Sequence, residues 1–188
     1  MQIRPLTAID KDALAGLSHL LCDCVNNGAS IGFLAPLPTN TAHYYWTQVF
    51  KALEGSLYLW VAESEGKILG SVQLNVCTKD NGRHRAELQK LMVLSTARGQ
   101  GIAKHLLKTA EDHAKHNGLL LLILDTEQGS AAECVYQHLG WEQAGVIPDY
   151  ATTPDGRLHP TVYYFKHLLT ISGETSSNSS ALATHRIS

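Results

Sequence analysis

The sequence predicts an α+β fold in which a mixed, mostly antiparallel β-sheet is flanked by helices. The first observation is the order of the segments: a strand, two helices, three strands, a helix, a strand, a helix and two strands. This order is neither a strict βαβ alternation nor an all-β pattern. The second is size, since 188 residues, 44% of them hydrophobic, suffice for one domain with a sizeable core. We expect a single domain over residues 1–170 and a disordered tail over residues 171–188, which are polar and poor in bulky apolar side chains.

The N-terminal part of the chain is predicted to hold one strand and two helices. Residues 2–6 have the length of a short strand. A helix that ends at Asn26-Asn27-Gly28 is indicated by apolar residues at helical spacing, namely Leu14, Leu17, Leu20, Leu21 and Val25. Residues 28–33 (GASIGF) are small and flexible, and Pro36 and Pro38 stop any helix there. A second helix is expected from Thr41 to Leu53.

Three strands are predicted next. Residues 57–64 and 67–76 read as a hairpin, because Glu65-Gly66 between them is typical of a tight turn. Asn81-Gly82 marks another turn before a third strand, which begins near Glu87 and ends near Leu94.

The remainder of the domain alternates helix and strand. A helix with Ile102, Ala103, Leu106, Leu107 and Ala110 on one face ends at Asn117-Gly118. The continuous apolar run 119–124 predicts a central strand covered on both faces and ending at Asp125. Residues 130–133 (SAAE) form a capping box for a helix whose inward face is Ala132, Val135, Tyr136 and Leu139. Strands are expected at 141–147 and 161–168, with a turn at 153–156 (TPDG).

Composition excludes several classes of function. A formal net charge of -2 argues against nucleic-acid binding through a basic face. No apolar run approaches the roughly 18 residues of a membrane span, and nothing resembles a signal peptide, so we expect a cytoplasmic protein with no membrane partner. We expect no metal site: His113 and His116 read as a solvated helix face. The cysteines have no metal or redox spacing and are expected to be free and mostly buried, namely Cys22, Cys24, Cys77 and Cys134.

The turn between the third predicted strand and the following helix has the features of a phosphate site. The first N–H groups of a helix have no backbone partner, and the helix dipole puts partial positive charge there. Gly99 and Gly101 let an anion approach this backbone closely, and Arg98 adds a permanent positive charge. The alternative is an ordinary glycine-containing turn.

Two nucleotide motifs do not fit this turn. A P-loop requires Lys-Ser/Thr after its last glycine, whereas Ile102-Ala103 follows Gly101. A dinucleotide fold requires a third glycine where Lys104 stands, although Asp125 lies at a suitable distance downstream.

The pattern that remains, Arg98-x-x-Gly101-x-Ala103, resembles the (Gln/Arg)-x-x-Gly-x-(Gly/Ala) signature of the GNAT acetyltransferase superfamily. Residues 136–141 (YQHLGW) resemble the Tyr-x-x-x-Gly-Phe segment of the same family, with Trp141 in place of phenylalanine. The order of the predicted elements is also that of the family. Longer segments between about residue 14 and about residue 168 resemble its tabtoxin-resistance group, whose members acetylate a toxin.

The resemblance implies the GNAT acyl-CoA N-acyltransferase fold and acetyl-CoA as the acyl donor. It implies that two parallel strands splay apart to admit the cosubstrate, and that a backbone N–H near Val93 stabilises the oxyanion. The implied reaction is direct acetyl transfer to the amine of a small molecule, with a toxin or antibiotic as one candidate, and the implied assembly is a homodimer. Cosubstrate contacts are expected from Met92, Val93, Leu94, Arg98, Gly99, Gln100, Gly101, Ile102, Ala103 and Ser130.

Two residues are candidates for the chemistry that the resemblance implies. Tyr136 is the candidate acid that protonates the leaving thiolate, an uphill transfer of about 2 kcal/mol between ordinary tyrosine and thiol pKa values. Its alternative role is an aromatic residue of the apolar helix face. Asp125 is either the base for the acceptor ammonium or its counter-ion. Acceptor contacts are expected from Gly28, Ala29, Ser30, Phe33, Glu87 and Asp125.

Two other functions stay open at this point: a protein or peptide N-acetyltransferase, and a non-catalytic acyl-CoA sensor. The sequence leaves undetermined the identity of the acceptor, the role of Asp125, the oligomeric state and the use of other acyl donors.

Overall fold

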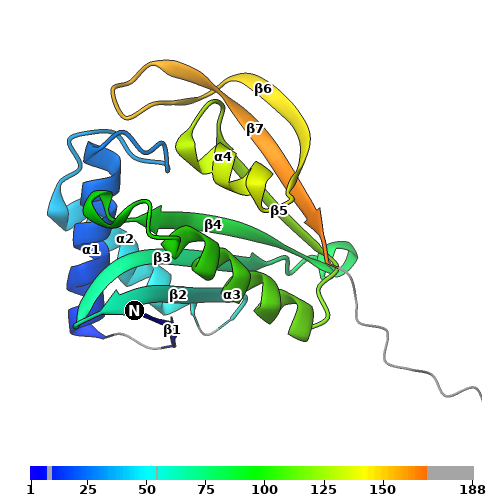
Figure 1. Cartoon of the computed structure of the whole chain (residues 1–188), viewed down its shortest axis with the longest axis horizontal. Coiled ribbons are helices and arrows are strands. Elements are labelled where there is room, and N and C mark those ends of the chain that lie inside the picture. The colour runs from blue at the N-terminus through cyan, green and yellow to red at the C-terminus, as the bar shows by residue number, and fades with distance from the viewer. Residues whose placement is uncertain (8–9, 54, 169–188) are drawn as a thin grey trace, which may run out of the picture.

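The computed structural model describes residues 1–7, 10–53 and 55–168, so the predicted tail lies outside the described residues. The elements follow the predicted order (Figure 1). The N-terminal elements are β1 (Gln2–Leu6), α1 (Lys11–Asn26), α2 (Thr39–Ala52), β2 (Leu57–Ser64), β3 (Lys67–Val76) and β4 (Arg85–Val93). The C-terminal elements are α3 (Ile102–His116), β5 (Leu121–Glu127), α4 (Ala131–His138), β6 (Glu142–Thr152) and β7 (Leu158–His167).

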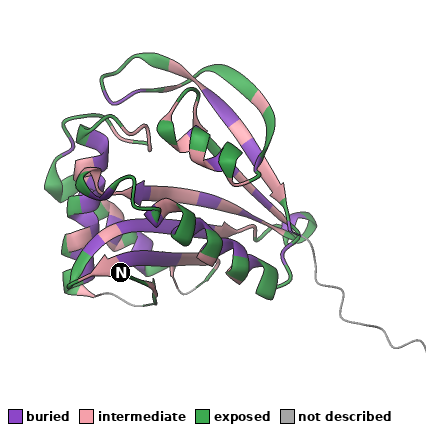
Figure 2. Cartoon of the chain, viewed as in Figure 1, coloured by how far each residue is buried: buried purple, intermediate pink, exposed green. Residues whose placement is uncertain are grey.

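One seven-stranded sheet runs through the molecule in the order β1-β2-β3-β4-β5-β7-β6. Every neighbouring pair is antiparallel except β4 and β5, which are parallel. The predicted mixed, mostly antiparallel sheet is therefore confirmed. The edge strand β6 is exposed along most of its length (Figure 2).

The two faces of the sheet bury separate apolar cores because strand side chains alternate between them. In β2, Leu59 and Val61 pack with α1 and α2, whereas Trp60 and Ala62 pack on the opposite face with α3. Each fully buried leucine contributes roughly 1.5–3 kcal/mol. The leucine stripe of α1 and the apolar face of α3 therefore hold these two helices against opposite faces of the sheet.

The predicted strand at 119–124 is displaced and is covered on one face only. Leu119 continues the end of α3, because its N–H donates to the carbonyl of Ala114. The strand instead runs through Asp125 to Glu127, paired with β7. Only Leu122 and Leu124 are buried within it, because the α1–α2 layer does not extend over β5. Asp125 thus lies inside β5 rather than at its exit.

Several element ends also differ from prediction. α2 begins at Thr39, directly after Pro38. The Ser130 hydroxyl accepts from the Glu133 N–H as a capping box requires, but the Glu133 carboxylate accepts from the N–H of Gly129 instead of reaching back to Ser130. The last two strands are longer than predicted, because their pairing extends to Thr152 and Leu158.

The prediction of a solvated face for His113 was wrong. Its ring centroid lies 4.4 Å from that of Tyr58 and 5.0 Å from that of Trp60, and its Nε2 atom is buried. The cysteines are free, but Cys24 is the one buried thiol. Among the described residues, no group of metal-ligating side chains forms a site. No helix in the described ranges is long and apolar enough to cross a membrane.

Candidate functional site

The parallel pair β4–β5 separates in the middle of the sheet. Only Arg85–Glu87 of β4 pairs with Leu121–Ile123 of β5. Beyond these pairs β4 continues beside β3 while β5 continues beside β7, and the two strands diverge (Figure 1). We call this divergence, between residues 88–93 and residues 124–127, the splay. Its inner backbone groups have no strand partner across the sheet, so an extended ligand that carries amides can bind between them.

A β-bulge bends β4 beside the splay. The register with β3 moves from Gln73↔Gln89 to Ser71↔Met92, which leaves Lys90 in the extra stretch. Lys90 has a φ of 50°, a left-handed conformation that costs a side-chain-bearing residue about 1–2 kcal/mol. The surroundings maintain it: the Ser71 hydroxyl donates to the Lys90 carbonyl at 3.2 Å.

The turn after β4 presents a row of free backbone donors. Within the described chain, no backbone or side-chain acceptor is present for the N–H groups of residues 98–104. Gly99 and Gly101 have φ values of 78° and 76°, and no side chain caps the start of α3. Unbonded N–H groups at the positive end of a helix dipole are a binding site for an anion. The residues predicted to bind phosphate therefore lie together in this turn, and their role in binding stays a prediction.

The end of α1 fixes the end of β4. Asp23 accepts from the Ser95 N–H and from the Ser95 hydroxyl, both at 2.7 Å. The Cys24 thiol donates to the Val93 carbonyl at 3.5 Å. These contacts hold the stretch between the splay and the row of free donors. Sequence reasoning missed both side chains, although an aspartate beside the apolar stripe of α1 was a visible signal.

Three charged side chains share the region of the splay. Glu87 is paired with Ile123, and Asp125 lies two residues further along β5, so both carboxylates lie on the same face of the sheet. Desolvation and then the charge of Glu87 raise the pKa of Asp125, while the charge of Lys90 opposes this rise. Desolvation lowers the pKa of Lys90, and the charges of Asp125 and Glu87 oppose that change. The structure thus brings together two predicted acceptor residues and adds Lys90, which the sequence did not identify.

Tyr136 lies on α4 and is 7% exposed. Its ring centroid is 5.9 Å from that of Trp141 and 6.4 Å from that of Tyr164. Burial and then the charge of Asp125 raise the pKa of Tyr136 above the usual tyrosine value. The phenol is therefore protonated at neutral pH, as a proton donor must be, although a higher pKa makes the transfer to a thiolate more uphill.

The segment after α1 reaches the same region. The N–H groups of Gly28 and Ala29 close α1 by donating to the carbonyls of Val25 and Cys24. Further on, Phe33 packs edge-on against Tyr45 of α2, with ring centroids 5.3 Å apart. Among the expected acceptor residues of this segment, Phe33 is thus joined through Tyr45 to Lys90, whose ammonium lies 5.7 Å from that ring.

The remaining predicted residue, Ser130, is the N-cap of α4. Its hydroxyl caps the helix and lies 3.3 Å from the Thr126 hydroxyl. It is thus already engaged within the protein.

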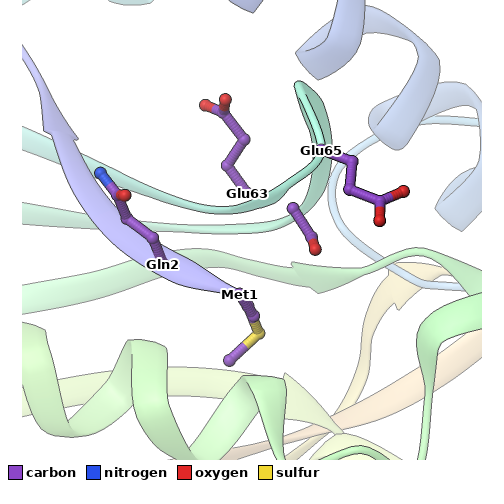
Figure 3. A pocket seen from close by; sticks show the side chains of 5 residues that line it. Met1, Gln2, Glu63 and Glu65 are labelled. Atoms are coloured by element: carbon purple, nitrogen blue, oxygen red, sulfur yellow. The ribbon is translucent and has the colours of Figure 1, made fainter.

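A shallow hollow elsewhere lacks the features of a site. It lies at the β1–β2 edge and is lined by Met1, Gln2, Glu63, Ser64 and Glu65, and Figure 3 shows Glu63 and Glu65 pointing away from one another. The sheet order puts β2 and β3 between this edge and β4, so the hollow is separate from the splay.

Comparison with known proteins identifies the family. Residues 17–141 match the model described as the acetyltransferase (GNAT) family. The chain belongs to the GNAT family. Its splay, row of free donors and order of elements thus lie within a GNAT acetyltransferase domain, the family that the sequence predicted.

Solved structures support the GNAT fold. A ribosomal-protein-alanine N-acetyltransferase from Brucella melitensis has a TM-score of 0.73 at 25% identity, over 89% of this chain and 100% of its own. A putative acetyltransferase from Salmonella typhimurium, solved with its cofactor acetyl-CoA, has a TM-score of 0.71 at 19% identity, over 94% of this chain and 100% of its own.

A curated relative of this GNAT chain is N-acetyltransferase 8 from Rattus norvegicus, 39% identical over 90 residues, which cover 46% of this chain and 40% of that protein. The chain thus spans less than half the length of this relative. Closeness to the toxin-acetylating group stays a prediction.

Proposed function

We propose that this protein transfers the acetyl group of acetyl-CoA directly to the amine of a small molecule, for which a toxin or an antibiotic is one candidate. The observation that carries the proposal is the continuity of two features. The row of free N–H groups at residues 98–104 follows the end of β4, and β4 forms one side of the splay beside Glu87 and Asp125. A coenzyme held by its diphosphate at this row would extend its reactive end along β4 into the splay.

The cosubstrate in this proposal is bound by the end of β4, by the phosphate turn and by the start of α4. The residues are Met92, Val93, Leu94, Arg98, Gly99, Gln100, Gly101, Ile102, Ala103 and Ser130. Most of these contacts are made by backbone groups, so the residue types matter mainly through the conformations that they allow. The Val93 N–H would donate to the oxyanion, a role that the anchoring of Val93 and Ser95 to α1 supports.

The proposed chemistry includes three proton transfers. The acceptor ammonium loses a proton to Asp125, directly or through water, or is held beside Asp125 as an ion pair and loses its proton to solvent. The free amine attacks the thioester carbonyl, and the Val93 N–H stabilises the resulting oxyanion. Collapse of this intermediate breaks the carbon–sulfur bond, and Tyr136 protonates the departing thiolate. The second proton that the attacking nitrogen has to lose passes through solvent to the resulting tyrosinate, which leaves a neutral amide and a neutral phenol. The pKa rise of Asp125 favours its role as base, because an ordinary aspartate near pH 3.8 is too weak a base for an amine.

The acceptor side is proposed to include Gly28, Ala29, Ser30 and Phe33, with Glu87 and Asp125 across the splay. A small acceptor is favoured by a contact over this region: the Ala35 N–H donates to the Pro154 carbonyl at 2.9 Å. This bond joins the segment after α1 to the β6–β7 turn. A peptide would have to pass beside or displace that connection.

A protein N-acetyltransferase is the second candidate. It is favoured by the likeness to the ribosomal-protein-alanine N-acetyltransferase named above. A non-catalytic acyl-CoA sensor is the third, and Tyr136 with Asp125 argues against it, because a sensor needs only the cosubstrate site.

A homodimer in the cytoplasm completes the proposal. The β6–β7 hairpin exposes four large apolar side chains that a second copy would cover, namely Val146, Ile147, Tyr150 and Leu158. The free thiols agree with a reducing compartment.

Thiol release from acetyl-CoA tests the proposal against a panel of small amines, aminated antibiotics, amino acids and peptides. We expect release with members of the small-molecule set and little with peptides. A preference for peptides would favour the second candidate, and coenzyme binding without release in any mixture would favour the sensor.

A further inference from the structure

Lys90 carries an ammonium that has no ion-pair or hydrogen-bond partner among the described residues. Among the described residues, no carboxylate lies within 4.0 Å of its Nζ atom, and no hydrogen bond is present there. The side chain is half-buried, and burial of an unpaired charge is costly. The neighbouring carboxylates of Glu87 and Asp125 act on Lys90 through their charge but do not contact it. Lys90 is therefore available to an anion from outside the protein.

The surroundings hold this ammonium in one place. Its Nζ lies 5.7 Å from the centroid of the Tyr45 ring, a favourable cation–π position. The Tyr45 hydroxyl is in turn hydrogen-bonded to the buried side chain of Gln73, and Phe33 packs against the ring. The backbone of Lys90 is fixed by the bulge in β4. A lysine anchored at both ends of its side chain is suited to fixed recognition rather than to solvation.

Gly32 lies directly beside the ammonium. A Cβ atom at this position would lie 3.9 Å from Lys90 Nζ, so a side chain there would be in contact with the charged group. Gly32 also has a φ of 91°, which other residues rarely adopt. This glycine belongs to the segment proposed to line the acceptor side.

The charge pattern is complementary to a zwitterion. Glu87 and Asp125 supply negative charge for the acceptor ammonium, and Lys90 supplies a positive charge on the acceptor side. We propose that Lys90 binds a carboxylate of the acceptor, so that the acceptor is an amino acid or a related molecule with a carboxylate beside its amine. This proposal rests on the acceptor side assigned under the proposed function, and Lys90 acts as a specificity-determining residue there.

Matched acceptors separate carboxylate recognition from other roles of Lys90. The probes are L-amino acids, their carboxamides and the corresponding decarboxylated amines, which share one side chain and differ at the carboxylate. Each is tested for acetyl transfer with acetyl-CoA and, separately, for calorimetric binding to the protein saturated with CoA. We expect at least a tenfold higher kcat/KM, or a tenfold tighter Kd, for one or more amino acids than for their carboxamides.

Substitution then assigns this preference to Lys90. Lys90→Met should reduce the preference to within about twofold, mainly through KM, and Lys90→Arg should restore part of it. The matched control is Lys67→Met, which removes an exposed lysine at the start of β3 and should leave the preference intact. Binding of acetyl-CoA alone, measured by calorimetry, serves as the control that Lys90→Met is folded. For each acceptor, kcat/KM of the variant is divided by kcat/KM of the wild type. This ratio cancels the different basicities of the probes.

The inference is overturned if the wild type treats acids and carboxamides alike, or if Lys90→Met retains the preference. An equal loss on all three classes of probe would also overturn it, because that pattern indicates an effect on Asp125 rather than recognition of a carboxylate. Binding of amino acids to the CoA complex without any acetyl transfer would instead contradict the proposed function while supporting the role of Lys90.

Discussion

The charge of Asp125 acts on Tyr136, although the two residues lie on opposite sides of the sheet. Asp125 lies on the face that carries Glu87, whereas Tyr136 of α4 packs in the core on the face that α3 covers. The Asp125 charge still contributes to the rise in the Tyr136 pKa. An anionic Asp125 therefore helps to keep the phenol protonated before the reaction begins, which is the state required of a proton donor.

Removal of the Tyr136 hydroxyl isolates its chemical role. We expect Tyr136→Phe to retain acetyl-CoA binding and to lower kcat at least tenfold, because the ring contacts with Trp141 and Tyr164 are kept while the proton donor is lost. Calorimetry and steady-state kinetics measure the two effects. An unchanged kcat would leave Tyr136 as a packing residue only.

The pH profile of Asp125→Asn separates a base from a counter-ion. A base acts in its ionised form, so the wild-type kcat/KM should increase with pH through the Asp125 pKa, which desolvation and Glu87 raise above 3.8. If Asp125 is the base, the variant loses this acidic limb and most of its kcat. If Asp125 is a counter-ion, the variant keeps the wild-type kcat and its pH profile and shows a higher KM. Glu127→Gln, at the end of the same strand, is a control that should change neither the pH profile nor KM.

At the scale of elements, one buried ion pair joins α3 to the C-terminal strands. Glu111 of α3 is 8% exposed and accepts two bonds from the Lys166 ammonium, each of 2.8 Å, and one of 3.2 Å from the Trp141 indole. Lys166 also donates to the Leu139 carbonyl at the end of α4. The network therefore fixes α3, α4 and β7 relative to one another.

Removing only one partner of the Glu111–Lys166 pair should lower the free energy of unfolding more than replacing both partners. Glu111→Ala leaves a partly buried ammonium unpaired, and we expect the free energy of unfolding to fall by about 3 kcal/mol. The double variant Glu111→Leu/Lys166→Met should lose much less, because no buried charge remains. Urea denaturation measures both. Equal losses in the single and double variants would mean that packing, and not charge, accounts for the stabilisation.

Elements with local signals were predictable from the sequence. The β2–β3 hairpin has the predicted bounds because Glu65-Gly66 sets its turn, and the leucine stripe of α1 marks its buried face. β5 was misplaced because a continuous apolar run does not reveal where strand pairing begins. The bulge at Lys90 depends on the register with β3, and no local residue pattern reports that register. The sequence therefore pointed to Glu87 and Asp125 beside the splay but not to Lys90, whose position depends on that register.

At the scale of the whole molecule, β5, β6, β7 and α4 are joined to the remainder through few backbone bonds. The β4–β5 pairing covers three residue pairs, and the Ala35–Pro154 bond lies on the opposite side of the splay. A ligand that occupies the splay would add contacts to both sides. Binding of acetyl-CoA should therefore stabilise the folded chain as one unit, by about 2.7 kcal/mol at a hundred times its Kd.

A pair of glycines tests whether the free donors at the start of α3 supply this stabilisation. Gly101 and Gly118 have nearly the same φ, 76° and 73°, at the two ends of α3. Alanine at either position should cost about 1 kcal/mol of stability, because both adopt the left-handed conformation. Only Gly101→Ala adds a methyl group beside the row of free N–H groups, so only this variant should weaken acetyl-CoA binding, by at least tenfold, and reduce the coenzyme-induced rise in Tm. Calorimetry and thermal unfolding with and without acetyl-CoA measure both effects. Equal weakening by Gly118→Ala would show that general destabilisation, and not the anion site, controls the affinity.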